Sequence, residues 1–449
     1  MKTRIKLFLL CFILAYAGRA AAEPSEMNIS GEMRFRPEMR NNADFNDNTN
    51  DQQAYIGQRI RLNFDIKTEN GIKAFISAQD SRKWGDVPNN QTAGNAATYI
   101  YTTTCTQAQV TAGTCSTQAA STVKMPDSQS LDIYQAWFML ENVGGAPVDF
   151  KIGRQQLIYG DQRLIGASGW TDNGRAYDAY KVVARLDMVQ LDLFLAKLKE
   201  TGGAPSDSGS DDDLYGLYTI WPLGDANKLD VYYLVWKTDA VTFGRSVNTY
   251  GLRLAGKMGG LDYTAEGVFQ GGKWSATVDQ SASAFAVTGG YTLADVLGGL
   301  RLGFEYDMGS GDDKSDAKTH KTFVFPFGTN HAPYGYMDYF SWGNMSDIAL
   351  KAKAKPADAL TTEIAYHMFS LAQAKDTWLK ADGSTMLAAN TETSTNAGSE
   401  IDLTAAYAYN ASVKITAGYS MFMPGQAAKG RSGGSDASSW GYGMFELAF

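Results

Sequence analysis

The residues of this chain whose type and spacing best suit the binding of anions are arginines at alternate positions. Arg34 and Arg36 are two positions apart, and so are Arg59 and Arg61 in the stretch QRIRLNFDIK. A guanidinium group stays charged at physiological pH and binds carboxylate or phosphate through paired hydrogen bonds. Because a spacing of two places side chains on one face of a strand, we predict a basic wall on two adjacent strands. Such a wall would bind or select anions.

The same alternation assigns further charged residues to this polar face. The basic ones include Arg185, Arg253, Arg301, Lys351 and Lys353. The acidic ones include Glu32, Asp65, Asp262, Glu266, Glu305, Asp307, Asp347, Glu363, Glu400 and Asp402. Two interpretations stay open: the bases select ions, or they pair with the acids and keep the wall polar and rigid.

Arg154 does not follow this alternation. Alternation from Phe150 and Ile152 predicts that Arg154 points to the apolar face. An arginine side chain on that face destabilises the folded barrel by about 2–4 kcal/mol at the middle of a bilayer. Either a bulge at Gly153 turns it inward, or it lies beyond the bilayer at the base of a loop. We favour the bulge and count Arg154 among the inward bases.

The elements that position these residues are strands with one apolar face. Ile60, Leu62, Phe64 and Ile66 alternate with charged neighbours, and LRLGFEYDM, DIALKAKAK and EIDLTAAYAY repeat the pattern. A half-buried strand of a water-soluble sandwich also alternates, but here the opposite face carries full charges over about 9–11 residues. The sequence therefore predicts an all-β fold, a transmembrane antiparallel β-barrel with its charges inside.

The connections between the strands are of two kinds, which alternate. Short turns are expected at 68–71, 142–147, 186–188, 222–227, 258–260, 294–299, 355–358 and 409–412, with longer polar loops between them. Eight turns and nine loops connect eighteen strands, with both termini on the short-turn, periplasmic side and the long loops outside. The strand at 283–293 is weak, so sixteen strands stay open. Residues 23–449 are expected to form this single domain.

The two ends of the chain indicate where it resides. Lys2, Arg4 and Lys6 precede an apolar run and the small residues Ala20–Ala22, which is the pattern of a secretory signal peptide over residues 1–22. Its removal leaves a formal charge of about −12, the wrong sign for a nucleic-acid binder. The final strand, WGYGMFELAF, ends on Phe449, which we interpret as a signal read by the outer-membrane assembly machinery.

Cysteine, histidine and acidic runs supply weaker candidates. Cys105 and Cys115 form either a disulfide, as suits an oxidising compartment, or two free thiols. The acidic runs 207–213 and 310–316 lack a calcium-loop signature, so they indicate solvated tips more than a Ca²⁺ site. We expect no metal, cofactor or catalytic residue. The hydrolase alternative would centre on His367, which is predicted to lie inward beside Glu363.

The segment 158–176 is the connection richest in functional residue types. It contains Asp161, Arg163, Trp170, Asn173 and Arg175, and Asp178 follows at the start of the next strand. Loops often narrow barrels of this size, so we expect this one to fold inward as a constriction or lid. The alternative is an ordinary external loop with an internal salt bridge.

Two stretches resemble the alginate-export family of outer-membrane porins. They are FKIGRQQLIYGDQRLIGASGWTDNGRAYDAYKV (150–182) and FPFGTNHAPYGYMDYFSWGNMSDIALKAKAKP (325–356). The motif residues of the first are Gly153, Arg154, Gln155, Gly160, Asp161, Arg163, Leu164, Ile165, Gly166, Trp170, Asn173, Arg175, Tyr177 and Asp178. The resemblance implies an eighteen-stranded barrel that passes anionic solutes by diffusion.

This chain departs from the family in its mixture of inward charges. Alginate export in that family relies on a strongly electropositive pore, so we expect a different anionic solute or an oligosaccharide. The predicted function is an outer-membrane channel, not an enzyme, with lipid, the assembly machinery, the solute and a periplasmic protein as partners. The alternatives are a loop-plugged structural or partner-binding barrel and, ranked below it, the hydrolase.

Overall fold

The structure is a computed structural model, and it describes residues 24–49, 51–68, 71–85, 98–100, 122–124, 131–199, 211–239 and 244–449. The predicted signal peptide, Cys105 and Cys115 lie outside these residues. No helix of the described part is long and apolar enough to cross a membrane.

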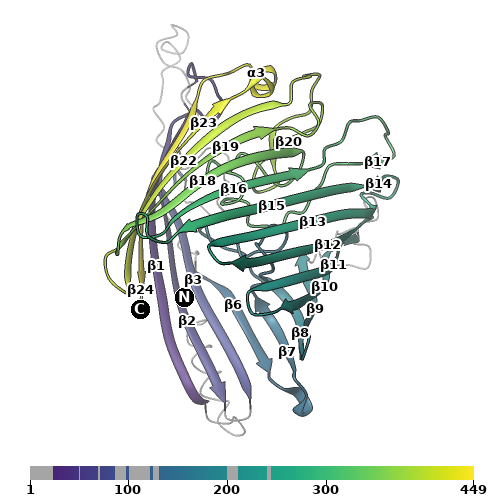
Figure 1. Cartoon of the computed structure of the whole chain (residues 1–449), viewed down its shortest axis with the longest axis vertical. Helices are drawn as coiled ribbons and strands as arrows, with labels where there is room; N and C mark the ends of the chain where they lie inside the picture. Colours follow the sequence, from purple (N-terminus) through teal and green to yellow (C-terminus); the bar gives the residue numbers. More distant parts are fainter. Residues whose placement is uncertain are drawn as a thin grey trace.

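Long antiparallel strands dominate the described residues (Figure 1). In the first half of the chain they are β1 (Pro24–Asn41), β2 (Gln53–Thr68), β3 (Ile72–Gly85), β6 (Leu131–Leu140), β7 (Val148–Gln155), β8 (Tyr177–Leu186), β9 (Val189–Lys199), β10 (Asp211–Leu223) and β11 (Asn227–Asp239). In the second half they are β12 (Arg245–Met258), β13 (Leu261–Lys273), β15 (Ala282–Leu293), β16 (Leu300–Gly309), β18 (Met345–Ala357), β19 (Leu360–Ser370), β22 (Asn396–Ala408), β23 (Val413–Pro424) and β24 (Ser438–Ala448).

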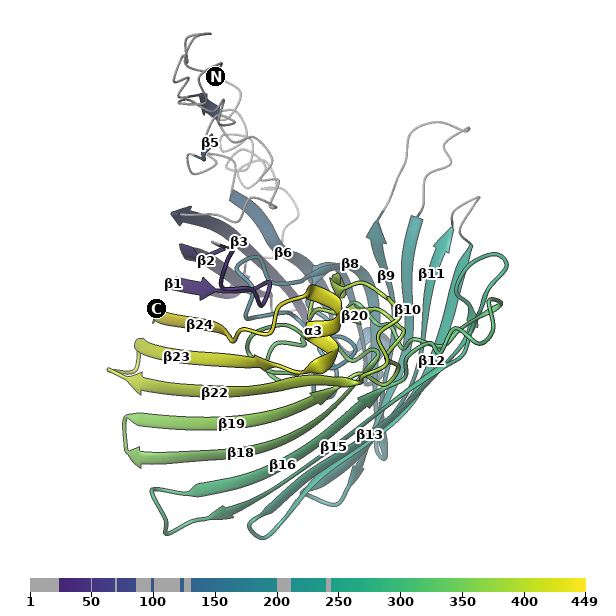
Figure 2. The ribbon, with the colours of Figure 1, turned by 90° about the horizontal axis from the view of Figure 1, so that it is seen from above.

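The remaining elements are short and lie in the connections. They are β4 (Thr98–Ile100), β5 (Thr122–Lys124), η1 (Val143–Gly145), β14 (Asp279–Gln280), β17 (Thr319–His320), β20 (Trp378–Leu379), β21 (Thr385–Leu387) and α3 (Gln426–Ser432). Seen from above, α3 and β20 lie inside the curve of the long strands (Figure 2).

Each long strand pairs with its neighbours in the chain, and β1 pairs with β24, so the described strands close into an eighteen-stranded barrel. Closure leaves no unpaired edge, which a sheet in lipid requires. Eighteen strands are thereby confirmed over sixteen, and the weak segment near 283–293 forms β15. Each of the eight predicted short turns overlaps a connection between consecutive long strands, but the one predicted at 355–358 is shorter than expected, because β18 continues to Ala357.

Alternation of side chains separates the outer face from the lumen. On β24, Phe445 and Leu447 are exposed outward, whereas Glu446 pairs with Lys414 at 2.6 Å inside. The interior is filled by aromatic side chains from several loops, among them Phe45, Tyr334, Phe340 and Trp378, all of which are buried. The barrel therefore has a packed interior in addition to its apolar outer belt.

The last residue completes the seam of the barrel. Gly31 N–H donates to the Phe449 carbonyl at 2.8 Å, and Phe449 N–H donates to the Gly31 carbonyl at 3.1 Å. A Cβ atom on Gly31 would stand 2.5 Å from the Phe449 ring, so the glycine makes room for that ring. Phe449 thus contributes packing and backbone pairing at the closure.

We expect Gly31→Leu to displace the Phe449 ring and to lower the yield of folded barrel, because overpacking costs about 1–3 kcal/mol. Deletion of Phe449 should act in the same direction. The measurement is the folded fraction on unheated gels after refolding and after expression in cells.

The matched control is Gly289→Leu. Gly289 is on the outer face of β15, and a Cβ atom there would meet nothing within 4 Å. If both leucine variants assemble equally well, the seam contact is not what limits closure.

Candidate functional site

The arginines of β1 and β2 form one cluster on the inner face. Arg34 lies directly opposite Arg59 in the strand pairing, and both are buried. Glu32 forms ion pairs with Arg59 at 2.9 Å and with Arg61 at 3.2 Å. Glu38 accepts from Arg36 Nε at 2.7 Å. Because these two carboxylates cannot balance the four guanidinium groups, the cluster needs further acceptors.

The loop 156–176 supplies these acceptors. Arg34 donates to the carbonyls of Gly169 and Thr171, each at 3.0 Å, and to the carboxylate of Asp172 at 2.8 Å. Arg59 donates to the same two carbonyls at 2.8 and 3.0 Å. The cluster therefore clamps one segment of the loop against the wall of the lumen.

Trp170 joins this clamp to a second loop. The Arg36 guanidinium lies 4.1 Å from the centroid of the Trp170 ring and donates to the Trp170 carbonyl at 2.6 Å. The other face of Trp170 stacks on His331 at 4.1 Å, and His331 stacks on Tyr336 at 4.8 Å. The column of four side chains ties loop 156–176 to loop 310–344.

The other end of loop 156–176 reaches the opposite wall. Asp161 accepts from Arg253 Nε at 2.9 Å, and Arg253 also pairs with Asp230 at 3.1 Å. Around eighteen strands, β12, which carries Arg253, is nine strands from β1 in either direction. The loop therefore crosses the lumen.

A buried ionic group holds the middle of the same loop. Arg163 pairs with Glu305 and, at 2.9 Å, with Asp307, and it donates to the Tyr334 hydroxyl at 3.2 Å. Arg175, at the end of the loop, donates to the Gly328 carbonyl at 3.0 Å. The Asn173 carbonyl accepts from Gln79 on β3 at 3.0 Å. Each candidate residue of the loop thus acts as an anchor.

Buried tyrosines of the loops remain protonated donors. Burial raises the pKa of the Tyr159 hydroxyl well above its ordinary value, and the nearby charge of Asp192, which accepts from it at 3.0 Å, raises it further. Burial likewise raises the pKa of Tyr334. Tyr159 also starts a stacked column with Tyr218 and Tyr232, at 4.4 and 5.2 Å. These hydrogen bonds are therefore independent of pH over the physiological range.

The remaining predicted bases lie on the wall itself, each beside an acid. Arg185 pairs with Asp149 and Arg301 pairs with Asp262, both at 2.6 Å. Lys351 pairs with Glu305 at 2.6 Å, and Lys353 pairs with Glu363 at 3.2 Å. Arg185 and Lys353 are half exposed, unlike the clamp arginines. The inner wall is therefore balanced in charge, with accessible bases toward the short-turn end.

The inward bulge expected at Arg154 is wrong. The pairings of β7 with β6 and β8 show no register shift, so the alternation continues and Arg154 points outward, paired with Asp178 at 2.9 Å. Gly153 does have φ +122°, and a Cβ atom there would meet the Ala136 carbonyl. The glycine allows a close backbone approach without changing which face the next residue uses. Neither Arg154 nor Asp178 lines the pore.

His367 does not stand beside its predicted partner. Its Nδ1 lies 2.6 Å from Asp347 and its Nε2 lies 3.7 Å from Asp402, whereas Glu363 pairs with Lys353. Among the described residues, the group recorded nearest Nε2 is therefore a carboxylate and not a hydroxyl or thiol nucleophile.

The acidic runs have partners of their own. Asp313 pairs with Lys321 at 2.7 Å, and Asp213 pairs with Lys197 at 3.0 Å. Asp211–Asp213 begin β10, so this part of the run 207–213 is not a loop tip. Among the described residues, no group of three or more metal-binding side chains is placed to hold an ion.

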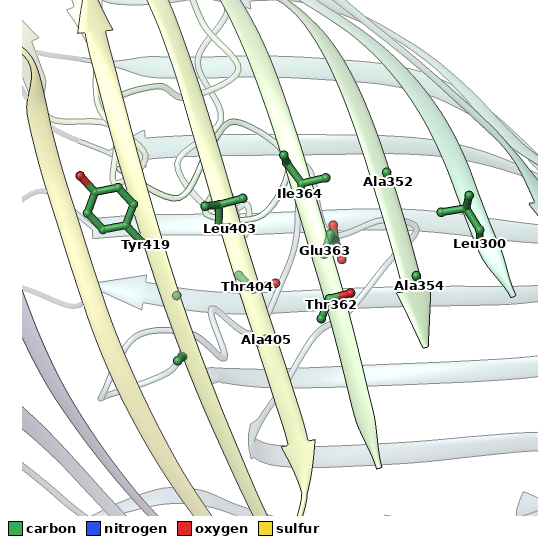
Figure 3. A pocket seen from close by; sticks show the side chains of 12 residues that line it. Leu300, Ala352, Ala354, Thr362, Glu363, Ile364, Leu403, Thr404, Ala405 and Tyr419 are labelled. Carbon is green, nitrogen blue, oxygen red and sulfur yellow. The ribbon is translucent and has the colours of Figure 1, made fainter. Parts of the chain in front are cut away.

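A depression of about 530 Å³ lies on the outside of the barrel (Figure 3). Ile364, Leu403 and Tyr419, which are exposed on the outer face, flank the small residues Ala352 and Ala405. Most of its lining is apolar, although Thr362, Glu363 and Thr404 also contribute, and its outward residues face the membrane, so it is not part of the solute path.

Sequence reasoning missed Asp172, Gln79 and most of loop 310–344 as partners of the arginine cluster. Asp172 stands between the motif residues Trp170 and Asn173, so its position was a usable signal. The contacts of Tyr334 and Tyr336 carried no comparable signal, because they depend on how two distant loops pack.

Comparison with known proteins agrees with this architecture. The family model for alginate export matches residues 25–441. Among solved structures, OccK5 (OpdH) of Pseudomonas aeruginosa is similar with a TM-score of 0.58 and 12% identity, over 96% of this chain and 99% of that one. OccAB1 of Acinetobacter baumannii has a TM-score of 0.59 and 11% identity, over 95% and 98%. Comparison with curated proteins gave no match.

Replacing Trp170 by alanine should loosen loop 156–176. The variant loses a cation–π contact and ring stacking together worth about 2 kcal/mol, or about thirty-fold faster local amide exchange. Hydrogen–deuterium exchange of the peptide covering 166–175 measures this effect.

Trp84→Ala is the control for that experiment. Trp84 is a tryptophan exposed on the outer face and packed on Phe35, so the barrel wall separates it from loop 156–176. Unchanged exchange at 166–175 in Trp170→Ala would show that the arginine clamp alone holds the loop.

Proposed function

This chain belongs to the alginate-export family, whose members form outer-membrane channels, and on that premise we propose that it passes small anionic solutes or oligosaccharides by passive diffusion. The observation that supports this most directly is the loop 156–176. The loop crosses the lumen and is anchored on opposite walls, at β1 and at β12. A loop held this way narrows the path without needing to move.

Two groups of bases have different roles in this proposal. The buried arginines Arg34, Arg36 and Arg59 hold the loop, because their N–H groups are already directed at its carbonyls and carboxylate. In this proposal, half-exposed bases on the wall, such as Arg185 and Lys353, determine the ion selectivity. A charged side chain influences which ions pass only if it is in contact with the solvent path.

The balance of charge favours moderate selectivity over a strongly electropositive pore. Each of the wall bases Arg185, Arg301, Lys351 and Lys353 has an acid within 3.2 Å. A pair of a base and a carboxylate offers both hydrogen-bond donors and acceptors, which suits the hydroxyl groups of sugars as well as an occasional carboxylate. This supports a solute with both kinds of group, such as a short acidic or neutral oligosaccharide, over a long polyanion.

The loop-plugged barrel is the second candidate, and the packed aromatic interior favours it. Phe340 stacks on Phe369 at 3.9 Å and on Trp378 at 4.7 Å, which fastens loop 310–344 to the wall and to a further loop. On this alternative the barrel is a structural or partner-binding protein. Among the described residues, the groups recorded beside His367 are the carboxylates of Asp347 and Asp402 and not a nucleophile, which disfavours the hydrolase alternative. We propose a channel without a catalytic residue or cofactor.

The surroundings of the channel follow from the same proposal. Residues 1–22 direct secretion to the periplasm and are removed, and the single domain from residue 23 is inserted by the assembly machinery that reads Phe449. The pore opens toward a periplasmic partner protein at its short-turn end. The half-exposed Lys353 and Arg185 lie toward this end of the barrel.

Planar-bilayer recording tests the channel and its selectivity together. The wild-type chain should conduct and show a modest preference for anions in a salt gradient. Lys353→Glu should move the anion-to-cation permeability ratio toward cations by about two-fold or more, because the group faces the solvent path. Absence of conductance in the wild type would establish the plugged barrel instead.

Arg59→Gln is the comparison variant within the same experiment. It removes a charge from the clamp, so we expect noisier current and a larger conductance with little change in the permeability ratio. If Arg59→Gln shifted the ratio as much as Lys353→Glu, the clamp arginines would be the selectivity groups after all.

A further inference from the structure

Lys151 is a lysine of the inner wall, on β7, that no acid neutralises. It lies directly opposite Lys181 in the pairing of β7 with β8, and Lys181 forms an ion pair at 2.6 Å with Asp192, which is buried inside the barrel. Tyr180, the neighbour of Lys181 in the chain, is exposed on the outer face. Among the described residues, the recorded contact of the Lys151 ammonium is with an aromatic ring, and no carboxylate forms an ion pair with it.

Other inward bases in this part of the wall are neutralised by acids. Lys73 on β3 pairs with Glu141 at 2.7 Å, and Arg185 on β8 pairs with Asp149 at 2.6 Å. Asp149 is two positions from Lys151 on the same face of β7, so the acid nearest to Lys151 in the chain already has a partner. Lys151 therefore adds a positive charge that the surrounding wall does not compensate.

Trp137 on β6 holds the Lys151 ammonium in place. The Lys151 Nζ lies 3.6 Å from the centroid of the Trp137 ring, which in turn stacks on Phe75 of β3, with centroids 5.6 Å apart and planes at 23°. Gly153, directly opposite Trp137 on β7, has no side chain, which leaves the ring open to the lysine. A cation over an aromatic face is attracted to the ring but keeps its charge and the N–H donors directed elsewhere. Lys151 is thus positioned without being neutralised.

The wall beside this ammonium is apolar. Met139 lies directly opposite Lys151 in the pairing of β6 with β7. Phe75, Trp137 and Met139 all belong to the inner face and are half-buried, so part of each side chain faces the lumen. Small-molecule sites typically combine a mainly apolar lining with a few polar groups that fix orientation. An uncompensated ammonium next to this surface complements a solute that joins a carboxylate to an apolar body.

The ammonium lies on the short-turn side of loop 156–176. β7 runs from the turn at 142–147 to this loop, and Lys151 is in the middle of the strand. Lys181, opposite Lys151, reaches the underside of the loop, because its Nζ lies 4.9 Å from the centroid of the Tyr159 ring. A solute that enters from the short-turn end therefore meets Lys151 before it meets the narrowing.

We propose that Lys151, supported by Trp137, is a binding subsite for the carboxylate of a small solute whose body has an apolar face. A lysine ammonium is a compact charge with three donors, which suits a single carboxylate. A polyanion would need a run of unpaired bases, and the nearby Lys73 and Lys181 already have acid partners. The inference rests on the proposed function, and it names the class of anionic solute that the channel would take.

Calorimetric titration of the detergent-solubilised barrel with cyclohexanecarboxylate tests this subsite. The wild type should bind this probe at least about ten-fold more tightly than acetate, which lacks the apolar body, and than cyclohexylmethanol, which lacks the charge. Inorganic phosphate should bind more weakly by a similar factor. Lys151→Gln should lose about ten-fold in affinity for the probe, because it removes a charge-assisted hydrogen bond. Lys151→Arg, which keeps the charge, should stay within about three-fold of the wild type.

Lys414→Gln is the matched control, because it removes the charge of a lysine inside the lumen that is paired with Glu446. It should change the affinity for cyclohexanecarboxylate less than two-fold. Trp137→Leu keeps an apolar side chain but removes the aromatic support, so it should lose about three-fold. Titration of protein-free micelles measures the heat of probe that enters the detergent, which is subtracted.

Equal affinity of the wild type and Lys151→Gln for the probe would overturn the proposal, and so would equally tight binding of acetate or cyclohexylmethanol by the wild type. If Lys151→Gln does not assemble, the ranking of the four probes on the wild type still tests the proposal. Binding requires access only from the short-turn end. Failure of the proposed channel would therefore appear as absent conductance with binding intact, whereas failure of this inference would appear as conductance without binding of the probe.

Discussion

A backbone inside a lipid bilayer has no water to satisfy its N–H and C=O groups, so each strand must pair on both sides. This constraint closes the barrel between β1 and β24 and leaves the terminal Phe449 hydrogen-bonded to Gly31. Continuous pairing also holds each strand in register. Since side chains alternate strictly along a paired strand, every residue has only two directions available, lipid or lumen. The distribution of charge over the molecule follows from that choice.

Inside the barrel, the same rule brings Arg34 and Arg59 face to face. Two buried guanidinium groups at adjacent positions repel each other and lose hydration, so their retention requires acceptors that the wall alone does not provide. The Gly169 and Thr171 carbonyls and the Asp172 carboxylate meet that need. The arginines therefore stabilise a loop across the lumen, and the loop in turn allows the arginines to be buried. The same contacts therefore narrow the pore and neutralise the charge of its wall.

Outside the barrel, the rule makes Arg154 and Asp178 partners on the lipid side. They are tolerated there because the pair lies at the end of its strands, where headgroups and water replace acyl chains. Arg154 and Arg163 are nine residues apart in one motif, yet the first is 41% exposed at its side chain and the second 3%. A family motif in this chain thus serves two environments separated by the barrel wall.

The amino-acid sequence alone predicted a barrel of eighteen or sixteen strands, its short turns and the polar side of β1 and β2, because period-two patterning is local and extends over most of each strand. Pairing in the folded barrel decided for eighteen. The sequence also placed Arg34, Arg36, Arg59 and Arg61 on one face. It did not determine whether those groups meet solvent or a loop, since the partners Asp172 and Trp170 lie more than 100 positions away with no periodic relation to them. The bulge expected at Gly153 failed for a similar reason: a positive φ is local, but the face of Arg154 is decided by its pairing with β6 and β8. Only the tertiary structure, in which loops from distant parts of the chain compete for the same lumen, decided which charges were buried as anchors and which stayed accessible.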